Sequence, residues 1–192
     1  RDMWRQLEKV TIPIFSGNNA EYEGWKATFT SCVDNAPATP QYKLLQMKKY
    51  LGGEALISVK KLGHSASAYA TAKERLERKY GGKRRRIALI KEELDQIKPL
   101  RDNQAKDMEM FADALDVCVA NLIEVDKSDE LGNGTFYSAM LVKLTDAMLT
   151  DYQRWLDDKN KEPNVQSLRE WVIREADFLT VTQETKRGVS GP

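Results

Sequence analysis

The side chains that most often carry acid–base, nucleophilic or metal chemistry are scarce in this sequence. The 192 residues include one histidine, His64, and two cysteines, Cys32 and Cys118. His64 stands between a glycine and a serine in a polar turn, where a solvated residue is more common than a catalyst. One histidine and two distant cysteines do not make a zinc-ligand pattern. We therefore expect no catalysis, no metal and no cofactor.

Motifs for phosphate binding or proteolysis are not found either. The glycine pairs at residues 52–53 and 81–82 lack the Lys-Ser/Thr sequence or the strand context of a phosphate-binding loop. No Asp-Thr-Gly or Asp-Ser-Gly triplet of an aspartic protease occurs. The sequence thus gives no reason to expect an enzyme or a small-molecule substrate.

The clearest charged feature is a run of four cations, Lys83, Arg84, Arg85 and Arg86. The whole chain has 30 Lys and Arg against 29 Asp and Glu, so it lacks the basic excess of a dedicated nucleic-acid binder. The run opens a predicted helix, where cations face the positive end of the helix dipole and repel one another. Contact with RNA or another polyanion would relieve both costs. The alternative is a basic run that only water solvates.

The elements that must position these residues are almost all helical. Apolar residues recur at helical spacing in nearly every segment after residue 19, which predicts an all-α fold. Thr39 and Pro40 suit the N-cap and first position of one helix, and Ser65 or Ser67 suits the cap of another. Ser167 and Glu170 have the spacing of a capping box. The apolar stripes of the predicted helices span residues 22–33, 44–51, 54–62, 68–80, 87–97, 108–122, 136–148, 155–156 and 168–179.

One short segment near the N-terminus alternates instead with period two. Its apolar residues are Val10, Ile12 and Ile14, and Pro13 lies between the last two. Because proline cannot donate a ladder hydrogen bond, the segment is an edge strand or an isolated extended arm. We expect the arm to lie along a groove of the first lobe. It either closes the core of that lobe or leaves an edge that a partner chain could extend.

A glycine pair, Gly81-Gly82, is the best internal boundary in the chain. It predicts two small helical lobes, residues 10–81 and 82–183, followed by a flexible tail at 184–192. A chain of this length is enough for two small domains with separate cores. The predicted core anchors are Trp25, Phe29, Phe111 and Trp171.

Three stretches carry a resemblance to a known family. They are "TIPIFSGNNAEYEGWKATFTSCVDNA", "YKLLQMKKYLGGEALISVKKL" and "YATAKERLERKYGG". In order and spacing they resemble the Gag capsid region of LTR retrotransposons, most closely the Bel/Pao branch. The matching positions are Pro13, Phe15, Ser16, Gly17, Trp25, Phe29, Lys43, Tyr50, Leu51, Gly53, Glu54, Ala55, Leu76, Tyr80 and Gly81.

The second half resembles the C-terminal capsid lobe of retroviral Gag and of the neuronal protein derived from Gag. The helix order is similar, but "RDNQAKDMEM" only loosely supplies the Gln and Glu pattern of the major homology region before Phe111. The resemblance implies two lobes of retroviral-capsid type and a structural protein that self-assembles into a shell packaging RNA. It implies a cytoplasmic location in virus-like particles, with other copies and RNA as partners. RNA would be bound by the basic run or by a region beyond Pro192.

A candidate self-association patch lies on the predicted helix at 136–148. The stripe from Phe136 to Met148 is expected to face the core, which leaves Tyr137, Leu141 and Val142 beside or beyond it. Related capsid lobes pair through the helix that follows the homology-region helix, and a two-fold contact needs only one such patch. The alternative is a wide stripe on a helix whose apolar residues are all core.

Two other functions fit the same sequence. One is a helical dimerisation or adaptor module that forms no particle, and the other is a nucleic-acid-binding regulator that uses the basic run. No apolar run approaches the length of about 20 residues that crosses a bilayer, so we expect no membrane contact. Both cysteines fall in helical patterns and are expected to be buried free thiols, which fits a cytoplasmic location.

Overall fold

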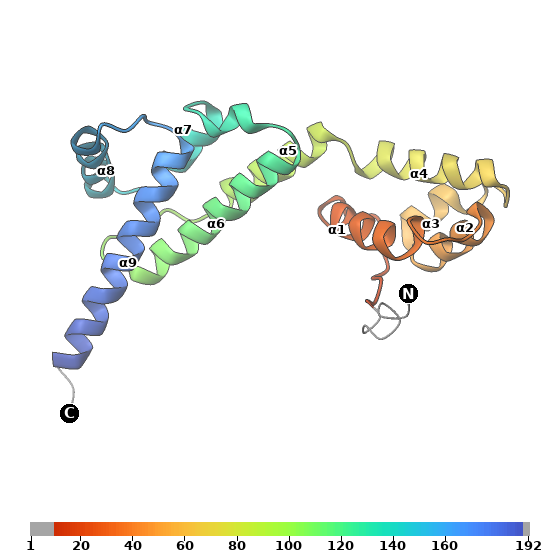
Figure 1. Ribbon diagram of the computed structural model, residues 1–192, viewed down its shortest axis with the longest axis horizontal. Helices are drawn as coiled ribbons and strands as arrows, with labels where there is room; N and C mark the ends of the chain where they lie inside the picture. Colours follow the sequence, from red (N-terminus) through yellow and green to blue (C-terminus); the bar gives the residue numbers. More distant parts are fainter. Residues whose placement is uncertain (1–9, 190–192) are drawn as a thin grey trace. The chain divides into compact units, whose positions relative to one another are not determined.

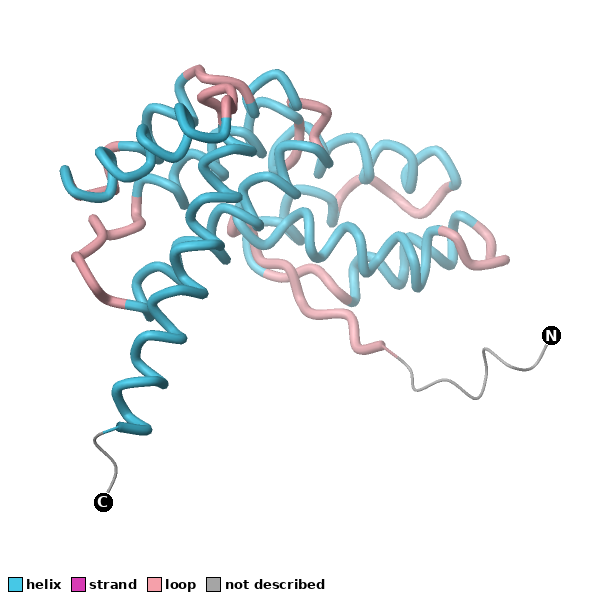
Figure 2. Tube along the Cα trace, turned by 60° about the vertical axis from the view of Figure 1, so that its left-hand side comes forward, coloured by secondary structure: helices cyan, strands magenta, loops and turns pink. Residues whose placement is uncertain are grey.

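The computed structural model describes residues 10–189, and along that range it is helical with no strand (Figures 1 and 2). The predicted all-α fold class is confirmed. The chain divides between Arg85 and Arg86 into two compact units, called here unit 1 and unit 2. The division falls just after the glycine pair at which the sequence placed the boundary.

Unit 1 consists of the extended arm and short helices. The helices are α1 (Asn19–Phe29), which continues into a π-helical turn η2 (Thr30–Asp34), α2 (Pro40–Lys49), α3 (Gly53–Lys60) and α4 (Ala66–Tyr80). A side chain caps the N-terminus of α1, α2 and α4. The Thr39 hydroxyl accepts a hydrogen bond from the Tyr42 N–H at 3.2 Å, and Pro40 opens α2 as predicted. The Ser65 hydroxyl caps α4 in the same way, through the Ala68 N–H.

The arm completes the core of unit 1. Phe15 forms an isolated parallel bridge with Leu51, in which its N–H donates to the Tyr50 carbonyl at 3.0 Å and its carbonyl accepts from the Gly52 N–H at 2.9 Å. Phe15 and Ile12 are buried, whereas Ile14 is exposed. Val10 is exposed as well, so the predicted alternation of Val10, Ile12 and Ile14 is not seen in the burial of the arm; its buried residues, Ile12 and Phe15, are three positions apart.

Aromatic rings fill the centre of unit 1. Phe15 lies edge-on to Tyr80 with 5.0 Å between ring centroids, and Trp25 stacks on Phe29 at the same distance. The Trp25 indole N–H donates to the Tyr50 carbonyl at 3.1 Å. Trp25 and Phe29 are therefore core residues, and Trp25 also ties α1 to the end of α2.

Unit 2 is built around two long helices that lie side by side. Its helices are α5 (Lys83–Asp95), whose first residues belong to unit 1, α6 (Ala105–Glu124), the 3-10 turn η3 (Ser128–Leu131), α7 (Thr135–Leu141), α8 (Asp146–Lys159) and α9 (Val165–Val189). Figure 1 shows α9 running along α6. Phe111 of α6 and Trp171 of α9 are buried in the core. None of the helices in the described range is long and apolar enough to span a bilayer.

Two predicted helix limits in unit 2 are wrong. The apolar stripe at 136–148 is divided between α7 and α8, because the Thr145 side chain accepts from the Met148 N–H at 3.2 Å and caps a new helix. Trp155 lies within α8 and not in a short helix of its own.

The predicted capping box is not the start of α9. The Asn164 side-chain carbonyl accepts from the Ser167 N–H at 2.8 Å, and the helix begins at Val165. The same helix continues to Val189, although a flexible tail was predicted from residue 184. No proline and only one glycine, Gly188, interrupts that stretch. Residues 190–192 lie outside the described range.

Candidate functional site

Most of the predicted self-association patch on α7 is buried in unit 2. Tyr137 is only 6% exposed, and its hydroxyl shares a hydrogen bond of 2.9 Å with the hydroxyl of Tyr152 on α8. The expectation that Tyr137 is available to a partner is therefore wrong. The reason is that α7 is covered on more than one side, by η3 and by α8.

The rest of the patch is small. Leu141 is half-buried, and Val142, which follows the end of α7, is 71% exposed. Single exposed apolar side chains are common on protein surfaces. Val142 alone therefore does not define an interface.

The basic run is partly engaged by the chain itself. The Arg85 guanidinium donates to the Gly81 carbonyl at 2.8 Å and to the Arg78 carbonyl at 3.3 Å. These carbonyls end α4, where a cation offsets the negative end of the helix dipole. Arg86 pairs with Glu124 at 3.6 Å. Lys83 and Arg84 are the more exposed members of the run.

The residues considered for chemistry do not come together. His64 is exposed in its turn, and both cysteines are free thiols. Burial raises the pKa of the Cys118 thiol to about 11, and the charge of Glu93 adds to the shift. Cys32 is exposed, contrary to the prediction that both thiols are buried. Between residues 10 and 189, no group of three His, Cys, Asp or Glu side chains could hold a metal ion.

A family model covers most of the chain. The model is described as "Protein of unknown function (DUF1759)", and it matches residues 15–161. The chain belongs to the DUF1759 family. The match begins at Phe15, a buried residue of the arm, and runs from unit 1 into unit 2 to just past the end of α8. No curated protein and no solved structure matches the chain.

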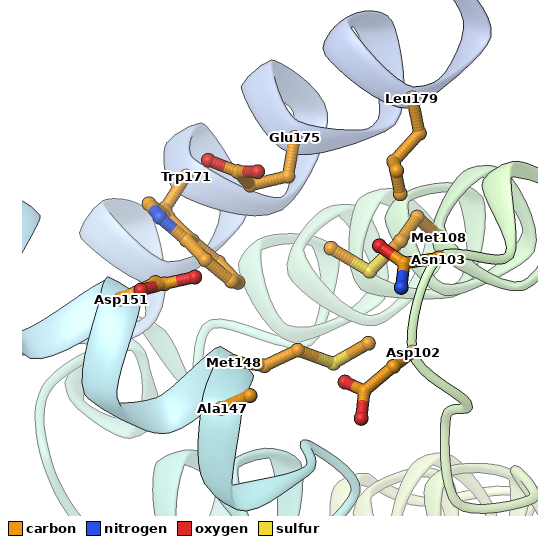
Figure 3. A pocket seen from close by; sticks show the side chains of 9 residues that line it. All are labelled: Asp102, Asn103, Met108, Ala147, Met148, Asp151, Trp171, Glu175 and Leu179. Atoms are coloured by element: carbon orange, nitrogen blue, oxygen red, sulfur yellow. The ribbon is translucent and has the colours of Figure 1, made fainter. Parts of the chain in front are cut away.

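In this DUF1759 protein, a cavity of about 250 Å³ opens between α6, α8 and α9 (Figure 3). Met108, Met148 and Trp171 form apolar walls, and the carboxyl groups of Asp151 and Glu175 lie at its edge. Burial raises the pKa of the Glu175 carboxyl, with Arg174 opposing the shift and Asp151 adding to it. Glu175, which interrupts the apolar stripe in the sequence, thus faces this cavity. The titratable side chains in its lining are the carboxyl groups of Asp102, Asp151 and Glu175.

A second hollow surface, which the sequence did not reveal, runs along α6, between this helix and the segment made of the end of α5 and the following residues 96–101. It consists of two adjoining hollows of about 720 and 150 Å³ that share Ile97 and Ala114 as lining residues, and we call them together the α5–α6 groove. Met110 and Val117 stand at its edge and are 65% and 51% exposed. These residues and Ala114 recur at helical spacing, and this second stripe on α6 was the available signal.

Proposed function

We propose that this chain is the capsid segment of a Gag-like protein of an LTR retroelement, or of a host protein derived from one. In this role, copies of the chain associate with one another and build a shell around RNA. The proposal rests on where unit 1 places the residues that carry the resemblance to Gag. Phe15, Trp25 and Tyr80, which belong to the resemblance, meet in one aromatic core closed by the arm.

The division into two units supports the same function. Each unit has its own hydrophobic core, and the family match spans both. Building blocks of curved shells need several contacts with their neighbours, and separate small lobes can supply different ones. Exposed apolar side chains occur on both units, as such contacts require. They include Tyr42, Leu45 and Ile57 on unit 1 and Met110 and Val117 on unit 2.

The contacts that the basic run makes within its own chain help to choose between the structural and the regulatory function. A regulator that binds nucleic acid through this run would need its cations in solvent, whereas Arg85 caps α4 and Arg86 pairs with Glu124. RNA contact by Lys83 and Arg84, together with residues outside this chain, remains compatible with a packaging role. The structural function is therefore better supported than the regulatory one.

The test is the assembly state of the purified 192-residue chain. We expect negative-stain electron microscopy to show closed particles when protein and salt concentrations are raised, and sedimentation velocity to show the corresponding large species. A discrete dimer at every condition would contradict the proposal and favour the adaptor module. A monomer at every condition would contradict self-association altogether.

A further inference from the structure

We propose that the α5–α6 groove is a two-fold self-association surface, at which the groove of one copy packs on the groove of a second copy. This inference rests on the proposed function, because it names one of the contacts between copies that a shell requires. It also places that contact away from α7, where Tyr137 is part of the core.

The first argument is that α6 has two apolar faces but only one of them is covered. Met108, Leu115 and Leu122 point into the core of unit 2 and are buried. Met110, Ala114 and Val117 follow the spacing i, i+4, i+7 and form a separate stripe along the groove. Exposed apolar residues that are contiguous and border a hollow mark an interaction site more strongly than scattered ones do.

The second argument concerns the centre of the groove. Ala114 and Ile97 line both hollows, so they mark the point where the two meet. A small side chain at this point allows the backbones of two helices to approach closely. A two-fold axis through this point would relate the two copies. Val117 of each copy would then face the hollow of the other copy that Met110 borders.

The third argument is charge complementarity, and it selects a second copy as the occupant. Glu93 lines the hollow at one end of the groove, and Lys98 lines the hollow at the other. The nearby Arg101 is already held by Asp107 at 3.0 Å. A two-fold axis between the hollows places Glu93 of each copy beside Lys98 of the other. A groove for a basic or an acidic peptide would instead carry one sign of charge along its length.

The structure offers a matched pair of variants for the first test. Val117 and Ile123 are β-branched residues on α6 with exposures of 51% and 52%, but Ile123 does not line the groove. Val117→Asp is expected to raise the dissociation constant of the dimer about tenfold or more, measured by sedimentation equilibrium of the full chain. Ile123→Asp should leave it within about twofold. Circular dichroism checks that both variants keep the helical content of the wild type.

The second test uses the predicted charge pairs. Glu93→Lys and Lys98→Glu should each weaken the dimer, because each brings like charges together at both ends. An equimolar mixture of the two variants should restore association, since the two mixed pairs are then Lys with Glu. Restoration by the mixture is the result expected if these residues meet across the interface, and its absence would overturn the charge pairing.

The outcomes separate this inference from the proposed function. If particles form and Val117→Asp leaves both the dimer and the particles unchanged, the groove is not the contact, and the capsid function stands. If the dimer depends on Val117 and on the charge pairs but no particle forms under any condition, the groove assignment stands and the capsid function is wrong. Equal weakening by Val117→Asp and Ile123→Asp would overturn the groove assignment.

Discussion

The hydroxyl groups of Tyr137 and Tyr152 share a hydrogen bond of 2.9 Å inside unit 2. This bond joins α7 to α8, which a helix cap at Thr145 separates in the sequence. Burial raises the pKa of both hydroxyls above the ordinary value. The pair therefore stays protonated at neutral pH, and it holds Tyr137 against the core rather than against a partner.

The Tyr137–Tyr152 bond can be tested by a single deletion of an oxygen atom. Tyr137→Phe leaves the Tyr152 hydroxyl buried without its partner, which should lower the free energy of unfolding by about 1–3 kcal/mol. Urea denaturation followed by circular dichroism measures the change. The dimer dissociation constant should not move. A weaker dimer with an unchanged free energy of unfolding would show instead that Tyr137 contacts the second copy.

Trp25 offers the corresponding test in unit 1. Its replacement by alanine removes the stack on Phe29 and the donor to the Tyr50 carbonyl. Truncation of a buried tryptophan costs about 3–5 kcal/mol, and we expect a loss of that size in urea denaturation. A loss below about 1 kcal/mol would show that Trp25 is not in the core.

The acid side of the stability profile should depend on Asp34 at the end of η2. The hydrogen bond from the Tyr69 hydroxyl is the main reason that the pKa of this carboxyl lies below its ordinary value of 3.8; partial burial opposes the shift, and Lys73 supports it. Because the folded pKa is the lower one, the stabilisation is complete above the unfolded pKa and is lost as pH falls through the folded pKa.

Asp34→Asn should therefore destabilise the protein at neutral pH. The difference between wild type and variant should narrow as pH falls from about 5 to about 2. Urea midpoints measured across that range give the comparison. A difference that stays constant with pH would mean that the Asp34 charge contributes nothing to folding.

Lys83 and Arg84, the exposed half of the basic run, should contribute to the salt dependence of RNA binding. Replacing Lys83 and Arg84 by glutamine should flatten the salt dependence of binding to a single-stranded RNA oligonucleotide. The slope of log K against log salt should change by about 0.7 for each phosphate that the variant no longer neutralises. Arg85→Gln is the control, since Arg85 caps α4 and its replacement should affect stability more than the slope. An unchanged slope in the Lys83, Arg84 variant would place any RNA contact elsewhere.

Features that depend on neighbouring residues could be predicted from the sequence. The caps at Thr39 and Ser65 need only a hydroxyl and an N–H three residues away, and both occur. The extended arm was likewise predicted from residues 10–14 and Pro13, but its alternation did not predict which side chains are buried, because Ile12 and Phe15 are buried and Ile14 is exposed. The same logic failed at Thr145, because the apolar stripe continues through the turn and hides the new cap.

Features that depend on distant residues could not be predicted in this way. Arg85 binds carbonyls of the preceding helix, which converts part of a basic run into a helix cap. The α5–α6 groove depends on Ile97 and Ala114 lining the same hollows, and their proximity could not be predicted from the sequence. A core stripe and an interface stripe on α6 have the same residue types, and only the packing of the other helices distinguishes them.

Two glycines of unit 1 should respond in opposite ways to the same substitution. Gly17 turns the arm into α1 with a φ of +121°, and a Cβ there would lie 3.5 Å from the Tyr80 hydroxyl and from Glu54. An L-residue is strained in this conformation, so Gly17→Ala should lower the free energy of unfolding by about 1–3 kcal/mol. Gly24 lies in the middle of α1, where a Cβ meets nothing within 4 Å.

Gly24→Ala should therefore stabilise the protein by about 0.5–1 kcal/mol, because it reduces the freedom of the unfolded chain without strain in the fold. Both variants are measured by urea denaturation under the same conditions, and each serves as the control of the other. If the arm is anchored as described, only the Gly17 variant also releases Phe15, and the near-ultraviolet dichroism of the aromatic cluster should weaken. Equal and small effects of both substitutions would show that the turn at Gly17 does not hold the arm in the core.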